Sequence, residues 1–538
     1  MYVFLTFAPI QGFIEKSRKL RDLYGASLIL SYLSHALIEA AQKKGAIVIS
    51  PGLPKIAQGM PNRILLQGNF SEEDAHQALV ESWRKMLDHC RQLLVQQIKE
   101  FHRIKQQADF DYTWEREWDK WKTSTWELFW AEGETPKDAK QQLEQRKLAR
   151  QWKAINWIGD SSSLSGSDAI AYPRLEAPDI NLTRGFPQSE THYIEVFYDT
   201  LAEMFDNHQS QWKTETENSE IEGKFIDANE RLSIPELVKR LVTHSEYANR
   251  IGIPHPKKFK DIVRKTPEKL YWTGWFMGDG DRMGDLLQKS LELGGDEGIG
   301  EFSRLVRQWG TDLYGLIPRE LGRTIYAGGD DFFGIFYRGQ AEQISGNSVL
   351  EQLKALHKSW QGLAATLTPL VQENATLSLG LVWVGGSVPQ RDVLQHCRDT
   401  QERSKKRGRD RITLRVVFNN GQFVEWTSPW EYLPILTAYQ DLDGGSNWSH
   451  VYRDLAQLKA RYALGFGVND LESLDSITIL DFKEGALEFL DIYFSGWKEK
   501  INKNRHKLFE YASPEAQKNC ELIHWIDNLI QVGWHLLS

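Results

Sequence analysis

The order of hydrophobic strands and amphipathic helices in residues 270–426 restricts the fold of this chain more than any other feature. A strand at 271–278 leads through a glycine-containing turn at 280–284 into a helix. The other predicted elements are strands at 324–327, 332–337, 377–384 and 412–418, with a tight turn at 328–331, and helices at 340–367 and 390–406. This is the split βαβ, or ferredoxin-like, order, which also builds the palm domains of polymerases and cyclases. We therefore predict an α+β fold that contains a palm domain.

The N-terminal segment repeats this pattern less completely. Residues 2–12 can be laid against 271–284, and residues 61–66 against the hairpin at 324–331. The first copy has no carboxylates where the second has four, which indicates one degenerate and one catalytic ferredoxin-like palm. The predicted domains are a degenerate palm at 1–160 with a Trp-rich helical insertion at 100–160, a middle domain of helices and loops at 161–268 with a disordered charged stretch near 214–222, the catalytic palm at 269–428, and a helical domain at 429–538.

Length and composition indicate a soluble globular protein of several structural units. A chain of 538 residues exceeds one ordinary hydrophobic core. No apolar run approaches the roughly 20 residues of a membrane helix, and the N-terminus lacks the flanks of a signal peptide. The three cysteines, Cys90, Cys397 and Cys520, form no CxxC pair, so we expect no disulfide framework and no structural zinc, and a reducing cytoplasm fits. Because the net charge is −8, any RNA contact should be local or shared with partner chains.

Tryptophans are concentrated between residues 114 and 130. Trp114, Trp118 and Trp121 follow the spacing of one helix face, and Trp126 and Trp130 come just after them. Such a stripe can stack on bases or dock a partner. Helical periodicity favours the other interpretation, a stripe that packs into the core.

Two acidic clusters have the placement that two-metal nucleotidyl transfer requires. Asp279 and Asp281 follow a hydrophobic strand, and Asp330 and Asp331 lie at the tip of a hairpin whose strands should pair beside it. Two Mg²⁺ ions held by such carboxylates activate a 3′-hydroxyl and stabilise a leaving pyrophosphate. A Gly-Gly-Asp-Asp sequence alone is also typical of an ordinary turn, but its pairing with Asp-Gly-Asp about 50 residues upstream favours a catalytic site. We expect Asp279 and Asp330 to be the main metal ligands, with Asp281 and Asp331 secondary.

Glycines and basic residues around these clusters are candidates for nucleotide binding. Glycines at the two turns permit positive φ and leave backbone amides free for phosphate oxygens. Lys405 and Arg409 belong to a basic run that ends the last palm helix and fits a triphosphate clamp. The same run would also suit a solvated helix end that complements the helix dipole. The full set of nucleotide-binding candidates is Gly280, Arg282, Met283, Gly328, Gly329, Ser378, Lys405 and Arg409.

Four stretches resemble the large palm-polymerase subunit of type III CRISPR effector complexes, particularly that of the Cmr branch. The first combines Pro-Ile-Gln-Gly-Phe-Ile at 9–14 with Lys-Leu-Arg-Asp-Leu-Tyr-Gly-Ala-Ser at 19–27. The other three are Gly-Met-Pro-Asn-Arg at 59–63, Gly-Asp-Gly-Asp-Arg-Met-Gly at 278–284 and Ala-Gly-Gly-Asp-Asp-Phe at 327–332. The resemblance implies an RNA-activated synthase that converts ATP into cyclic oligoadenylates, or joins adenylate to another small molecule. It also implies two Mg²⁺ or Mn²⁺ ions, Asp330 and Asp331 as the signature acids, and partners that include a small helical subunit, backbone and crRNA-handle-binding subunits, crRNA and target RNA.

The chain departs from this family pattern in two respects. It starts at the palm strand and contains no His-Asp dipeptide, so we expect no His-Asp nuclease domain and no DNase activity from this chain. Many relatives also carry two CxxC knuckles between the palms. The corresponding positions here read Ser-Ser-Leu-Ser-Gly at 162–166 and Leu-Ser-Ile-Pro-Glu-Leu-Val-Lys-Arg at 232–240, with serines and a glutamate where thiolates would stand.

The acceptor nucleotide should rest between the palms, because related cyclases pair two palms to place donor and acceptor. The polar candidates are Ser17, Arg18, Arg21 and Asp22. Arg21 and Asp22 could equally form a structural ion pair. Two other functions stay open from the sequence: a free-standing nucleotide cyclase without an RNA partner, and a catalytically silent scaffold, against which the four carboxylates argue.

Overall fold

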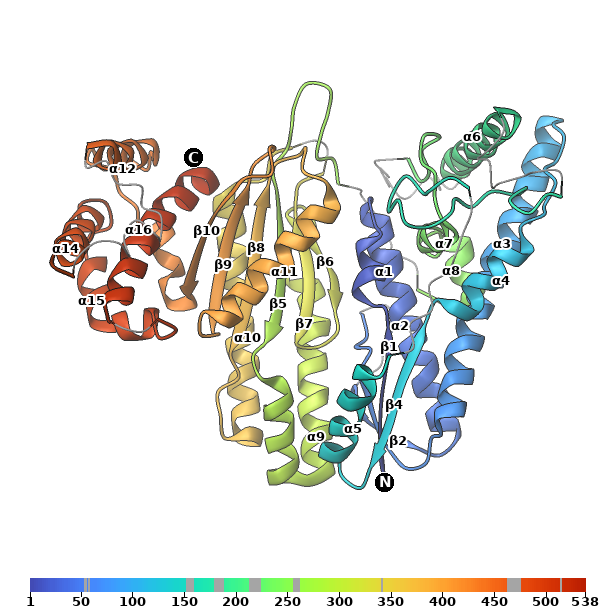
Figure 1. The fold of residues 1–538 in the computed structure, drawn as a ribbon, viewed down its shortest axis with the longest axis horizontal. Helices are drawn as coiled ribbons and strands as arrows, with labels where there is room; N and C mark the ends of the chain where they lie inside the picture. Colours follow the sequence, from blue (N-terminus) through green and yellow to red (C-terminus); the bar gives the residue numbers. More distant parts are fainter. Residues whose placement is uncertain are drawn as a thin grey trace. The chain divides into compact units, whose positions relative to one another are not determined.

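The computed structural model describes residues 1–52, 56, 59–150, 159–178, 188–211, 224–254, 262–339, 342–461, 476–512 and 515–538. The chain divides into two compact units. The first contains Met1–Val263, Ser290–Thr311 and Ile325–Gly329, and the second contains Arg264–Lys289, Asp312–Thr324 and Asp330–Ser538. Each unit contains helices packed on a sheet, which confirms the predicted α+β class (Figure 1).

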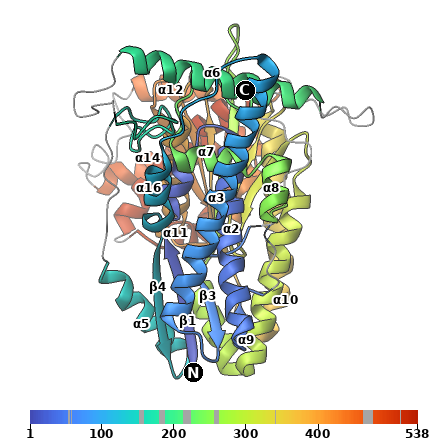
Figure 2. The same cartoon turned by 90° about the vertical axis from the view of Figure 1, so that its right-hand side faces the viewer.

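The first unit contains a four-stranded antiparallel sheet in the order β2-β3-β1-β4. Its strands are β1 (Tyr2–Ala8), β2 (Ile47–Ser50), β3 (Ile64–Gln67) and β4 (Glu127–Gly133). Short helix α1 (Gln11–Glu15) follows β1, and the long helices α2 (Leu20–Lys43) and α3 (Glu72–Lys105) run beside each other (Figure 2). Val3, Leu5 and Phe7 alternate toward their core, as the period of two in a strand requires. Strand order and connections are those of a ferredoxin-like fold.

Strand β4 corrects the predicted helical insertion at 100–160. Residues Glu127–Gly133 pair with the whole of β1 and close the sheet, between α4 (Glu115–Ser124) and α5 (Pro136–Leu148). Phe129 and Ala131 on one face of β4 pack against Leu143 of α5. The segment therefore completes the first palm.

The tryptophan stripe packs in the core of the first unit, which confirms the structural interpretation. Trp114 and Trp118 are 1% and 0% exposed, and Trp121 and Trp126 belong to the same hydrophobic cluster. Trp83 of α3 donates its indole N–H to the carbonyl of Trp121 at 2.9 Å. These rings are covered by protein and cannot stack on bases.

The middle region shares this core. Helices α6 (Gln188–Gln211), α7 (Ile234–Leu241) and α8 (Ser245–Ile251) contribute buried side chains to the same hydrophobic cluster as α2 and α3. Helix α7 lies against α2 so closely that a Cβ at Gly25 would meet the carbonyl oxygen of Lys239 at 1.8 Å. Only glycine fits at that crossing. The stretch predicted to be disordered, 214–222, lies outside the described residues.

The six-stranded sheet has the order β10-β9-β8-β5-β7-β6. Its strands are β5 (Thr273–Gly280), β6 (Gly322–Ala327), β7 (Asp331–Phe336), β8 (Leu377–Val384), β9 (Arg411–Val417) and β10 (Phe423–Pro429). Its main helices are α9 (Met283–Leu316), α10 (Gly346–Val371) and α11 (Gln390–Lys406). The order β6-β7-β5-β8 repeats that of the first sheet, so the internal repeat predicted from the sequence corresponds to two copies of one topology.

The C-terminal region is helical over the residues that can be described, as predicted. It contains η3 (Trp430–Thr437), α12 (Ser449–Arg461), α14 (Ser476–Tyr493), α15 (Trp497–Leu508) and α16 (Glu515–Leu537). Helix α16 packs on β9 and β10. Across the described part of the chain, every helix is too short or too polar to cross a membrane.

Candidate active site

The two faces of the second sheet are distinguished by two glycines. A Cβ at Gly380 would lie 2.2 Å from the Thr400 hydroxyl of α11, whereas a Cβ at Gly280 would lie 2.7 Å from the Trp360 ring of α10. Ser378 is two residues from Gly380 and pairs with Asp279 across the strands. Because side chains alternate along a strand, Asp279 and Ser378 lie on the α11 face and Gly280 on the α10 face.

Asp279 forms an ion pair with Lys405, which lies near the end of α11. The two side chains are 25% and 32% exposed, so the pair is accessible to solvent and to a ligand. An ammonium beside this carboxylate neutralises the charge that would otherwise attract a divalent cation. The predicted clamp residue therefore contacts the predicted metal ligand.

The hairpin acids lie beside the end of β5, as the sequence predicted. Asp331 is the cross-strand neighbour of Asp279, and the N–H of Gly280 donates to the carbonyl of Asp330 at 3.1 Å. Asp331 is exposed and Asp330 partly exposed. A Cβ at Gly278 would lie 2.1 Å from the Phe332 ring, so glycine is required for this close strand pairing.

Asp281 is placed differently from the other three acids. Its residue is only 4% exposed. Its Oδ1 accepts from the Ser378 hydroxyl at 2.7 Å, and its Oδ2 accepts from the Thr376 hydroxyl at 2.9 Å and the Asp410 N–H at 3.0 Å. Asp281 is thus a buried, hydrogen-bonded carboxylate at the start of β8 and β9.

The loop between α11 and β9 has an unusual backbone. Gly408, Arg409 and Asp410 have φ of +119°, +63° and +46°, and two of these residues are not glycine. Burial, and then the nearby charge of Asp281, raise the pKa of the Asp410 carboxyl to about 6. On the other side of the loop, Arg411 donates to the carbonyls of Leu508 at 3.0 Å and Lys507 at 2.8 Å.

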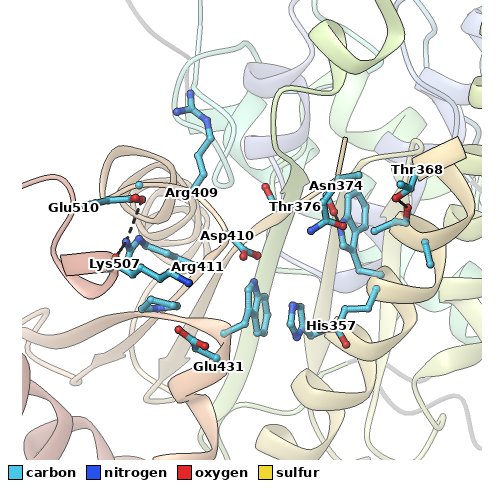
Figure 3. Close-up of a pocket in the computed structure, with 18 residues that line it drawn as sticks. His357, Thr368, Asn374, Thr376, Arg409, Asp410, Arg411, Glu431, Lys507 and Glu510 are labelled. Carbon is cyan, nitrogen blue, oxygen red and sulfur yellow. Dashed lines mark hydrogen bonds and ion pairs between the residues drawn. The ribbon is translucent and has the colours of Figure 1, made fainter. Parts of the chain in front are cut away.

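A cavity of about 950 Å³ opens beside this loop (Figure 3). Arg409 and Asp410 line it together with Thr376, and His357 stacks on Trp430 in its wall with ring centroids 4.4 Å apart. Burial lowers the pKa of His357 to about 4, so its ring is neutral at physiological pH. The cavity has the size of an ordinary small-molecule site.

The other predicted nucleotide-binding residues surround the ends of β5 and β6. Arg282 is exposed at the start of α9 with a φ of +52°, and Met283 lies so near Gly280 that a Cβ there would approach its side chain to 2.6 Å. Gly329 has a φ of +145°, and a Cβ at Gly328 would lie 2.0 Å from the Tyr326 hydroxyl. Gly329 is therefore favoured by its backbone conformation, and Gly328 by the close approach of the Tyr326 side chain.

The carboxylates at the end of β5 and the start of β7 are the candidate ligands for divalent cations. Among the described residues, no three Asp, Glu, His or Cys side chains converge to form a metal site by themselves. Mg²⁺ is commonly held by only one or two carboxylates, with substrate phosphates and water completing its six oxygen ligands. The paired positions of Asp279 and Asp331, with Asp330 next in the chain, fit that requirement.

The predicted acceptor residues belong to a buried network in the first unit. Arg240 forms two hydrogen bonds to Asp22, Nε to Oδ1 at 2.9 Å and Nη2 to Oδ2 at 3.0 Å, and both side chains are 0% exposed. Burial opposes ionisation of Asp22, but Arg240 and the N–H groups of Lys19 and Arg18 lower its pKa below the ordinary value. Asp22 thus forms a structural ion pair, but its partner is Arg240, whereas the sequence had suggested Arg21.

The other three acceptor candidates differ in exposure. Ser17 and Arg21 are buried, and the Arg21 guanidinium lies 5.1 Å from the centre of the Phe225 ring. Arg18 is exposed. Among the four candidates, Arg18 is the one whose side chain solvent reaches most readily.

The positions of the expected knuckles are joined by hydrogen bonds. The hydroxyls of Ser162 and Ser165 are 3.0 Å apart, and Ser162 donates to Oε1 of Glu236 at 3.0 Å. Oε2 of Glu236 accepts from the Ser233 N–H at 2.8 Å. The two Ser-x-x-Ser and Ser-x-x-Glu stretches therefore meet, as two CxxC knuckles would around a metal ion.

Sequence reasoning missed Thr376, Asp410 and Arg240. The only available signal for Thr376 and Asp410 was their place, each directly before a strand that borders β5 or β8. Arg240 was noted only as the end of a knuckle-like stretch, and nothing local marks it as the partner of Asp22.

Comparisons with known protein families match two segments of the chain. Residues 272–413 match the model of the Cas10/Cmr2 second palm domain, and residues 2–100 match that of the N-terminal region of the CRISPR-associated protein Cmr2. The matched segments define a CRISPR-associated palm-domain protein. The first segment resembles the second palm domain of Cas10/Cmr2, and the second resembles the N-terminal region of Cmr2.

Solved structures that match the chain include CRISPR-associated proteins. A Csm1–Csm4 cassette in complex with one ATP matches with 14% identity and a TM-score of 0.40, over 100% of this chain and 70% of that one. A type III-B Cmr-beta structure in the apo state matches with 11% identity and a TM-score of 0.47, over 99% and 81%. Csm1 of T. onnurineus matches with 12% identity and a TM-score of 0.43, over 100% and 70%. These scores are too low to extend the family assignment. A search of curated proteins found no match.

Proposed function

We propose that the second palm domain is a nucleotidyltransferase that converts ATP into cyclic oligoadenylates, or a related adenylate, when a type III CRISPR effector complex binds target RNA. The observation that carries the proposal is the placement of Asp279 beside Asp331 at the end of the central strand, with Lys405 in contact with Asp279. The match of residues 272–413 to the Cas10/Cmr2 second palm domain supports the proposal, and these residues supply carboxylate and ammonium groups at one edge of the sheet.

Two Mg²⁺ or Mn²⁺ ions would be held by Asp279, Asp330 and Asp331. When bound, they would activate the attacking hydroxyl and stabilise the leaving pyrophosphate. Lys405 and Arg409 would bind the triphosphate, and glycines 328 and 329 would allow close approach of the nucleotide. The chain would work in the cytoplasm with the small helical, backbone and crRNA-handle-binding subunits, crRNA and target RNA.

The decisive experiment is incubation of the assembled complex with labelled ATP, Mg²⁺ and target RNA, with products identified by mass. Replacement of both Asp330 and Asp331 by alanine should abolish product, because losing metal ligands costs several kcal/mol of transition-state stabilisation. Circular dichroism should be unchanged because these side chains are at an exposed turn. Product formation by the folded double variant would refute the assignment.

A further inference from the structure

We propose that Asp281 is a positioning residue for the triphosphate clamp and does not bind a metal ion. It holds the loop of residues 407–411, which carries Arg409 and follows directly after Lys405 at the end of α11. The proposal rests on the proposed function of the same site, because the ligand of the clamp is ATP.

The hydrogen bonds of Asp281 leave little capacity for a metal. An ionised carboxylate offers about four lone-pair sites. Three are used by the Ser378 hydroxyl, the Thr376 hydroxyl and the Asp410 N–H, at 2.7 to 3.0 Å. The backbone N–H of Asp281 also donates to the Thr376 carbonyl at 2.9 Å, so the residue is fixed at both ends. A metal ion would have to displace donors that the folded chain already supplies. Asp279, by contrast, is partly exposed and contacts the partly exposed ammonium of Lys405.

The loop needs an anchor because its backbone is strained. Three consecutive residues have positive φ, and conformations of this kind persist in non-glycine residues only when surrounding contacts impose them. Asp281 accepts the N–H of Asp410 from inside the sheet. Arg411, the next residue, is 2% exposed and fixes the other side of the loop by donating to the carbonyls of Lys507 and Leu508 in α15.

The placement of Arg409 follows from these two anchors. Along the chain, Arg409 comes between Lys405, which contacts Asp279, and Asp410, whose N–H donates to Asp281. Arg409 and Asp410 are among the lining residues of the 950 Å³ cavity, and the Arg409 side chain extends away from Asp410 and His357 (Figure 3). If the Asp410 N–H loses its acceptor, the loop can relax to ordinary φ values and Arg409 moves away from the clamp position. The expected defect is therefore weaker ATP binding with an unchanged number of bound metal ions.

The test compares Asp281→Asn with Asp285→Asn in the full chain within its complex. Asp285 is an exposed acid in the first turn of α9 and serves as the matched control. Mn²⁺ stoichiometry is measured by electron paramagnetic resonance in the presence of a non-hydrolysable ATP analogue, and amide exchange is followed over 407–411. For Asp281→Asn we expect wild-type Mn²⁺ stoichiometry, faster exchange over 407–411, and roughly tenfold weaker analogue binding, the effect of one lost charge-assisted hydrogen bond.

Loss of one Mn²⁺ per chain, or unchanged exchange over 407–411, would overturn the proposal. Thr376→Val removes one hydrogen-bond donor to Asp281 and retains the charge of Asp281, so it provides a milder variant if Asp281→Asn does not fold. Thr376→Val should show the same changes in amide exchange and analogue binding at smaller size. Amide exchange measures how firmly the loop is anchored, and it does not depend on turnover. A wild-type complex that makes no adenylate product would therefore refute the proposed function and still leave the role of Asp281 in holding the loop measurable.

Discussion

Removal of Arg240 should strongly destabilise the packing of α2 against α7. Arg240 and Asp22 are both 0% exposed and form a two-point ion pair, and Arg240 also contacts Glu230. Arg240→Ala leaves two buried carboxylates without this partner. Breaking one side of a buried pair costs about 3–5 kcal/mol. We expect the lower end of this range, because the N–H groups of Arg18 and Lys19 still donate to Asp22 and Lys19 still contacts Glu230.

The assay is native-state hydrogen exchange of the amides in α2 and α7, which gives a local opening free energy. A whole-chain unfolding curve is less informative because a chain of several units does not unfold in one step. Replacing the pair with apolar residues, Asp22→Leu with Arg240→Met, should recover only part of the loss, because Glu230 still lacks Arg240 and the N–H groups of Arg18 and Lys19 lose their acceptor.

The pH dependence gives a second check. The pKa of Asp22 is lowered in the folded chain, so the contribution of the pair is complete above the unfolded value of about 3.9 and disappears only as the pH falls through the lower folded value. A loss below 1 kcal/mol for Arg240→Ala, or one that vanishes already at pH 6, would refute this reasoning.

Three further predictions concern the first unit. Arg21→Ala should retain ATP and metal binding but lose turnover if the segment holds the acceptor, with Arg18→Ala as a comparison; full turnover in both variants would exclude that segment. Burial lowers the pKa of Lys239 to about 8, so between about pH 8 and 10.4 the folded chain binds fewer protons than the unfolded chain. The free energy of unfolding of the wild type, relative to that of Lys239→Met, should therefore rise across this interval. Parallel plots of stability against pH for the two proteins would contradict this prediction. Elemental analysis should find no stoichiometric zinc. Glu236→Ala should lower the free energy of unfolding by about 1–3 kcal/mol, because the Ser162 hydroxyl and the Ser233 N–H lose their acceptor. Zinc that is bound by the wild type and lost by this variant would contradict the prediction.

The second palm could be predicted closely because its local signals agree. The run at 377–384 is hydrophobic throughout and forms β8 with the predicted bounds. The following helix was also predicted with its observed bounds, 390–406, since it begins after a proline and ends before a glycine. Strand pairing then brought the two acidic clusters together, because consecutive elements of a ferredoxin-like fold leave few alternatives.

Features that depend on distant partners could not be predicted. Strand β4 was assigned to a helical insertion because it follows a Trp-rich helix and contains no clear alternation; it is stabilised by pairing with β1, more than 100 residues earlier. The distinct position of Asp281 depends on Thr376 and Asp410, which are 95 and 129 residues away. An Asp-Gly-Asp sequence does not reveal which carboxylate turns toward buried donors.

The first palm shows what replaces carboxylates at the equivalent place in the topology. Where β1 ends and β3 begins, the Asn62 side-chain amide donates to the Thr6 hydroxyl at 2.8 Å and to the Phe7 carbonyl at 3.3 Å. In the second palm, the end of β5 and the start of β7 carry Asp279 and Asp331. An amide and a hydroxyl that satisfy each other need no cation, whereas neighbouring carboxylates repel until a cation or a basic side chain neutralises them. The first palm thus carries neutral groups at the position where the second carries carboxylates beside a lysine. This difference in charge is the physical reason for proposing metal-dependent chemistry for the second palm and not for the first.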